Sequence, residues 1–96
     1  MNETIAPSEV TYDLSQMEAW REYEVILYND EEHSMEEVIG QIIKAIHCSP
    51  LRAEQIMLKA HHHGKAVVAI AGKSRAIRIA SVLRQIELHV SLRQVN

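Results

Sequence analysis

The chain has 96 residues, of which 47% are hydrophobic and 24% are charged, so it fits one domain with a single core and is not disordered throughout. Its formal net charge of -3 argues against generic binding to nucleic acid or to an anionic membrane, because both favour a basic surface. No run reaches the roughly 18 apolar residues of a membrane span, and the first residues lack the regions of a signal peptide, so we expect a cytoplasmic protein.

The first part of the chain shows no clear periodicity. Residues 1–22 mix Thr, Ser, Pro and acidic residues, which predicts a flexible extension ahead of a domain formed by residues 23–96. Trp20 is expected to anchor the end of this extension to the domain. The run Tyr23–Tyr28 is short, β-branched and aromatic and stops at an acidic loop, which is typical of a strand.

Two helices are predicted next, and both have clear start signals. Ser34 and Glu37 form the S-x-x-E pattern of a capping box. Ser49 can cap the second helix, Pro50 suits its first position, and Gly64 can end it as a left-handed cap. Each helix, the first running to about residue 47 and the second to about residue 63, has one apolar face: Met35, Val38, Ile39, Ile42 and Ile46, then Ala53, Ile56, Met57 and Ala60.

The remaining segments predict a strand, a helix and a strand. Ala66–Ala71 is continuously apolar and bounded by glycines, which favours a buried strand at the centre of the sheet. Lys73–Ile86 has apolar residues at helical spacing, whereas Leu88, Val90 and Leu92 alternate with polar residues. The order β-α-α-β-α-β predicts a single compact α+β domain, with a three-stranded antiparallel sheet packed against three helices.

Three segments together resemble the ClpS family of Clp protease adaptors: Tyr23–Glu31, Ser34–Val38 and Gln55–Val67. Each is a weak motif alone, but their order and spacing are specific. The resemblance implies an adaptor that binds N-degrons, the N-terminal degradation signals of target proteins. This adaptor would have no enzymatic activity and no cofactor. The resemblance also implies delivery of these targets to a Clp-family AAA+ unfoldase, ClpA- or ClpC-like, which supplies all ATP chemistry. We expect the adaptor to be a monomer.

A free N-terminus is an ammonium group with three N–H donors, so a site that binds it needs acceptors around it. Asn29 offers a carbonyl oxygen and Glu31 a carboxylate from the same loop, while Asp30 adds negative potential. Neutral His61 can offer a ring nitrogen from the second helix. We therefore predict that these four residues bind the α-amino group. Binding should weaken below about pH 6.5, where histidine becomes protonated and would repel the ammonium.

The first side chain of the target needs an apolar pocket beside this polar rim. Met57 lies four residues before His61, and Met35 and Val38 are three residues apart, so these side chains can form walls. The flexible thioether of methionine suits apolar ligands of different shapes. By resemblance, the pocket also includes Leu27 or Tyr28, Ala60 and Val90.

Each of these residues also has an ordinary structural interpretation. The Asn29-Asp30 pair is a common turn signal, and the apolar positions fit a plain helical core. The triplet His61-His62-His63 invites a metal hypothesis, but neighbouring helical side chains diverge by about 100°, so they cannot converge on one ion. We predict no metal site.

The sequence departs from the family pattern in three places. In the loop, Glu31 replaces a more usual Asp, and His33-Ser34 replaces a Thr-Pro pair. Around the pocket, Ala60 occupies a position usually filled by Val, and Glu37 one usually aromatic or apolar. The third helix is basic near its start, where the family tends to be acidic, which changes a surface that the resemblance implies for unfoldase docking.

These departures support a second hypothesis, in which the chain binds the unfoldase and modulates its substrate choice without recognising N-degrons. A third hypothesis is a hydrolase that uses Cys48 or the histidines. It is the weakest, because the neighbours His47 and Cys48 point apart and no third activating residue is evident.

Overall fold

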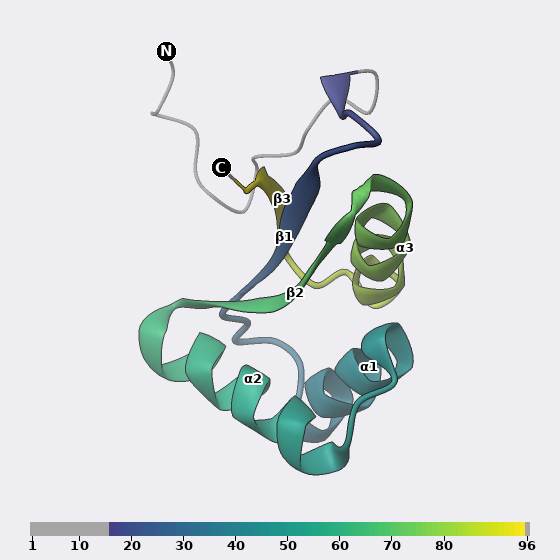
Figure 1. Ribbon diagram of the computed structural model, residues 1–96. Coiled ribbons are helices and arrows are strands. Elements are labelled where there is room, and N and C mark those ends of the chain that lie inside the picture. Colours follow the sequence, from purple (N-terminus) through teal and green to yellow (C-terminus); the bar gives the residue numbers. More distant parts are fainter. Residues whose placement is uncertain (1–15, 96) are drawn as a thin grey trace.

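The computed structural model describes residues 16–95, which form three helices and three strands (Figure 1). In chain order these are β1 (Glu22–Tyr28), α1 (Met35–Ile46), α2 (Pro50–His63), β2 (Lys65–Gly72), α3 (Lys73–Arg84) and β3 (Val90–Gln94). The predicted α+β class and the β-α-α-β-α-β order are confirmed.

Strand β1 lies at the centre of an antiparallel sheet with the order β2-β1-β3. The prediction that the apolar run Ala66–Ala71 forms the central strand is wrong, because β2 is an edge strand. Its apolar composition does not reflect burial on both faces, since Ile70 is 50% exposed and Val67 is partly exposed. Strand β1, which carries alternating glutamates at its start, has the deeper inward-facing residues, and Val25 is fully buried.

The three helices pack around one core. Helix α3 contacts all three strands, α2 contacts β1 and β2, and α1 packs mainly against the other two helices (Figure 1). The core has Ile42 of α1, Ala53 of α2 and Ile79 of α3 at 0% exposure. Helices α1 and α2 are therefore fixed side by side, close to the end of β1.

The predicted helix caps are all present. The Ser34 hydroxyl accepts a hydrogen bond from the backbone N–H of Glu37 (3.1 Å), and the Glu37 carboxylate accepts one from the backbone N–H of Ser34 (2.9 Å). The Ser49 hydroxyl accepts from the backbone N–H of Arg52 (3.1 Å), and Gly64 adopts the left-handed conformation (φ 88°) that ends α2. These caps set where the loop before α1 ends and where α2 stops.

Helix α3 ends at Arg84, two residues earlier than predicted. A turn follows in which Glu87 has a positive φ of 67°. The Arg84 guanidinium donates a hydrogen bond to the backbone carbonyl of Val90 (2.6 Å), which closes this turn onto β3. Leu88, between the turn and the strand, is buried in the core.

The folded part of the chain begins before residue 23. Met17 is 4% exposed and belongs to the core, whereas Trp20 is 71% exposed and has the Arg21 guanidinium over its ring, 4.1 Å from the ring centre. The expected anchor is therefore wrong, since Met17 and not Trp20 packs against the domain. The rest of the predicted extension, residues 1–15, lies outside the described residues. None of the helices within residues 16–95 is long and apolar enough to cross a membrane.

Candidate functional site

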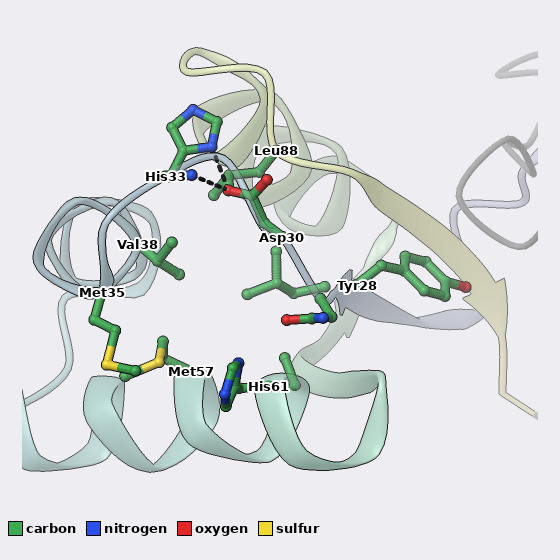
Figure 2. Close-up of a pocket in the computed structure, with 11 residues that line it drawn as sticks. Tyr28, Asp30, His33, Met35, Val38, Met57, His61 and Leu88 are labelled. Carbon is green, nitrogen blue, oxygen red and sulfur yellow. Dashed lines mark hydrogen bonds and ion pairs between the residues drawn. The ribbon is translucent and has the colours of Figure 1, made fainter.

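A pocket lies where the end of β1, the loop after it, and helices α1 and α2 meet (Figure 2). Its empty volume, which includes open solvent at the mouth, is about 350 Å³. The lining residues are Leu27, Tyr28, Asn29, Asp30, His33, Met35, Val38, Met57, Ala60, His61 and Leu88.

One side of the pocket is an apolar wall, which we define as Met35 and Val38 of α1 together with Met57 and Ala60 of α2. Figure 2 shows the methionine side chains of α1 and α2 extending toward each other between the two helices. Val38, Met57 and Ala60 are nearly buried, whereas Met35 is 49% exposed at the mouth. The four residues that helical spacing placed on the apolar faces of the two helices therefore line one pocket.

The opposite side is a polar loop, residues 29–33. The Asn29 side-chain N–H donates a hydrogen bond to the Glu31 carboxylate (2.8 Å), which leaves the amide oxygen of Asn29 as the atom able to accept from a ligand. The backbone N–H of Asn29 donates to the carbonyl of Gly64 (2.8 Å), which joins the loop to the end of α2. Glu31 is exposed and does not line the pocket. From this position, Glu31 can orient the Asn29 amide but does not face a ligand in the pocket.

The Asp30 carboxylate is held by three donors within the loop. Oδ1 accepts a hydrogen bond from the backbone N–H of Glu32 (3.1 Å). Oδ2 accepts one from the backbone N–H of His33 (3.0 Å) and also contacts Nδ1 of the His33 ring. Partial burial raises the pKa of Asp30, but the hydrogen bonds from Glu32 and His33 outweigh it and hold the pKa below its ordinary value of 3.8. Asp30 is therefore ionised at neutral pH.

His33 also lines the pocket, although it is not among the predicted site residues. The spacing Asp30-x-x-His33 could have indicated it, because an Asp side chain in a turn accepts from backbone groups two and three residues later. The hydrogen bond to Asp30 raises the pKa of His33 above its ordinary value of 6.5, although desolvation opposes this change. The two side chains form an ion pair when the ring is protonated.

His61 projects from α2 on the side of the pocket opposite Asp30 (Figure 2). The His61 ring lies edge-on to the ring of His62, with their centres 5.2 Å apart. Within residues 16–95, no group of three or more His, Cys, Asp or Glu side chains could hold a metal ion. His61 therefore lines the pocket across from the loop.

Of the residues that the resemblance adds to the pocket, Leu27, Tyr28 and Ala60 line it and Val90 does not. The Tyr28 ring turns away from the pocket toward β3 (Figure 2), where its hydroxyl is hydrogen-bonded to that of Ser91 (2.8 Å). Val90 does not line the pocket, because it pairs with Leu27 in the sheet and is buried in the core at 2% exposure. Leu88, two residues earlier and just after the turn, lines the pocket in its place.

The fold and the site define a small α+β domain that carries an apolar pocket with a polar rim between one loop and two helices. A family model described as ATP-dependent Clp protease adaptor protein ClpS matches residues 18–91 of this chain. The ATP-dependent Clp protease adapter protein ClpS of Sodalis glossinidius is 36% identical over 69 residues, which span 68% of this chain and 65% of that relative. The chain belongs to the ClpS family of Clp protease adaptors, as the sequence resemblance predicted.

A solved structure supports the same conclusion about the fold. ClpS2 of Agrobacterium tumefaciens, bound to L-phenylalaninamide, superposes with a TM-score of 0.74 over 78% of this chain and 98% of that chain. The two sequences are 22% identical, so this likeness establishes the shared fold alone.

Proposed function

We propose that this chain is an adaptor that binds the free α-amino group and the bulky apolar first side chain of N-degron proteins. It then delivers these proteins to a Clp-family AAA+ unfoldase of the ClpA or ClpC type. The adaptor acts as a monomer in the cytoplasm, without a cofactor and without catalysis of its own.

The observation that carries this proposal is the pairing of an ionised polar loop with an apolar wall in one pocket. The α-amino group would lie between Asp30, the amide oxygen of Asn29 and His61, which supply a negative charge and acceptors for its three N–H groups. The first side chain would then lie against the wall around Met57 and Val38, and its burial there would remove apolar surface from water.

The magnitudes agree with reversible capture. Burial of one bulky apolar side chain contributes roughly 1.5–3 kcal/mol, and each charge-assisted hydrogen bond about 1.5–3 kcal/mol, before the cost of association. These contributions support an affinity on the order of micromolar. L-phenylalaninamide, the ligand of the Agrobacterium protein, has both a free amino group and an apolar side chain, which supports the same ligand chemistry for this pocket.

A second function has support from one feature of the loop. Asp30 already has three internal donors, so the pocket could have lost ligand binding while the domain still binds the unfoldase and modulates its substrate choice. The hydrolase hypothesis lacks such support. Cys48 is partly buried against the core and does not line the pocket.

The test is a binding series with short peptides that begin with Leu, Phe, Tyr, Trp or Arg, each with a free and an acetylated N-terminus. Acetylation removes the positive charge and leaves the side chain intact. The adaptor function predicts binding of the free peptides that begin with an apolar residue, and at least about a tenfold loss on acetylation. Unfoldase binding without any peptide binding would support the second function, and peptide hydrolysis by the purified chain would support an enzyme.

A further inference from the structure

The hydrogen bonds of Asp30 show which of its oxygens could receive a ligand. A carboxylate has about four acceptor positions, two on each oxygen. Oδ2 uses both of its positions on His33, through the backbone N–H and the ring. Oδ1 uses one position on the backbone N–H of Glu32. An incoming ammonium can therefore be accepted by Oδ1, while His33 occupies the other oxygen.

The His33 ring is enclosed by groups that favour its charged form. Nδ1 contacts the Asp30 carboxylate, and the backbone of Ile86, in the turn after α3, also helps to raise the pKa of the ring. Glu37 of α1 adds a second negative charge nearby. The side chains of His33 and Asp30 are 19% and 17% exposed, so water screens their interaction less than on an open surface.

We propose that His33 is a positioning residue of the ammonium site, which orients the Asp30 carboxylate and sets by its own charge how strongly that carboxylate attracts an α-amino group. This inference rests on the proposed function. When His33 is charged, it and Asp30 form a neutral pair, and a ligand ammonium meets little net charge. When His33 is neutral, the full negative charge of Asp30 faces the ligand.

Binding and protonation are therefore coupled. A ligand ammonium beside Asp30 repels a charged His33, so binding favours loss of the ring proton, and loss of the proton favours binding by the same factor. Glu37 and the Ile86 backbone oppose this loss, as does Asp30 itself, and the pKa of His33 accordingly lies above 6.5. The coupling consequently operates as the pH rises above 6.5. It gives His33 a role distinct from that of His61, which faces the ligand directly from α2.

The coupling can be measured first on the wild-type protein. NMR titration of the His33 ring protons is performed on the free chain, and then with a saturating Phe-starting peptide that has either a free or an acetylated N-terminus. We expect the free-amine peptide to lower the titration midpoint of His33 and the acetylated peptide to leave it unchanged. In the Asp30→Asn variant, the midpoint of the unliganded chain should fall, because the partner charge is gone.

A substitution tests the same coupling through affinity. In His33→Asn, the amide nitrogen takes about the place of Nδ1 and keeps a donor for Asp30 but no titratable charge. We expect the affinity of the wild type for the free-amine Phe peptide to rise about fivefold more between pH 6 and pH 8 than that of His33→Asn. His63→Asn is the matched control, because His63 is exposed and does not line the pocket, and its pH profile should equal that of the wild type.

The outcomes separate this inference from the function on which it rests. Free-amine peptides could bind selectively while the titration midpoint of His33 does not move, or while the wild type and His33→Asn have parallel pH profiles. Either result overturns the role of His33 and leaves the adaptor function intact. A uniform loss of affinity at every pH in His33→Asn also overturns it, because that result indicates structural support alone. Equal binding of free and acetylated peptides overturns the adaptor function itself.

Discussion

The two sides of the pocket are held in place by different means. The apolar wall belongs to the core of the domain, since Val38, Met57 and Ala60 are 7%, 6% and 3% exposed. The polar loop is held mainly by hydrogen bonds among its own residues, together with a backbone bond from Asn29 to Gly64. The shape of the wall is therefore coupled to the stability of the whole domain, whereas the loop can change its chemistry at little cost in folding free energy.

The unusual residues within the loop and the wall follow this division. Both unusual side chains of the loop form hydrogen bonds within it: Glu31 with the Asn29 amide, and His33 with the Asp30 carboxylate. The two loop residues whose oxygens could accept from a ligand, Asn29 and Asp30, thus each have a hydrogen bond to a neighbouring side chain. Within the wall the change is one of volume alone, from a more usual Val to Ala60. Substitutions on the two sides should consequently differ in what they affect.

The largest effect on folding is expected from Met57→Ala. Truncation of this nearly buried side chain leaves a cavity in the core and should lower the free energy of unfolding by about 2–5 kcal/mol, as measured by urea denaturation. Met35→Ala is the matched control, because it removes the same atoms from a side chain that is 49% exposed. We expect less than about 1 kcal/mol for this control. Equal losses in the two variants would contradict the separation of core and mouth within the wall.

The loop should show the opposite pattern, with a large effect on binding and a small one on folding. Asp30→Asn removes the charge that the ammonium would meet, so we expect about a 10- to 100-fold loss of affinity for a free-amine Phe peptide. Calorimetry measures the affinity, and urea denaturation should show a change in stability under about 1 kcal/mol. Glu32→Gln removes a carboxylate from the same loop, but one that does not line the pocket. A similar loss in both variants would mean that the net charge of the loop, and not the position of Asp30, governs binding.

The same division explains how much could be read from the sequence. The helical wall follows from spacing alone, and the capping box at Ser34 and Glu37 fixed the start of α1 correctly. Helical spacing and helix capping depend only on residues close in the sequence, so predictions from them do not require the tertiary structure. The resemblance supplied the pairing of the loop with His61, which spacing alone did not reveal.

The errors arose where long-range packing decides the outcome. The apolar run in β2 has the composition of a central strand, but the chain order in the sheet depends on contacts between distant strands. Leu88 lines the pocket in place of Val90, and it directly follows a turn in which Glu87 has a positive φ. Non-glycine residues rarely adopt a positive φ, so the sequence did not predict this turn. Met17, and not the larger Trp20, reaches the core.

A smaller effect is expected from Glu31→Ala. The carboxylate accepts a hydrogen bond from the Asn29 amide, so its loss should let the amide rotate and present its oxygen to the ligand less often. Because both side chains are at the surface, we expect about a two- to threefold loss of affinity for free-amine peptides and no change in stability. Glu32→Ala serves as the matched control. An unchanged affinity in Glu31→Ala would show that the orientation of Asn29 is set by the backbone.

The smallest effect is expected on the pH dependence of folding, and its sign is opposite to that of binding. The pKa of His33 is raised above 6.5, so its pairing with Asp30 stabilises the fold fully below about pH 6.5, and this contribution is lost as pH rises through the raised value. The pKa of Asp30 is lowered, so the contribution is also lost at acid pH, as pH falls below 3.8 through the lowered value. The urea midpoint of the wild type should therefore exceed that of His33→Asn near pH 5 and approach it near pH 9. A constant difference would indicate that the His33 ring supports the loop by packing alone. If the difference between the two urea midpoints disappears at alkaline pH, the proton of the His33 ring both stabilises the loop and weakens ammonium binding.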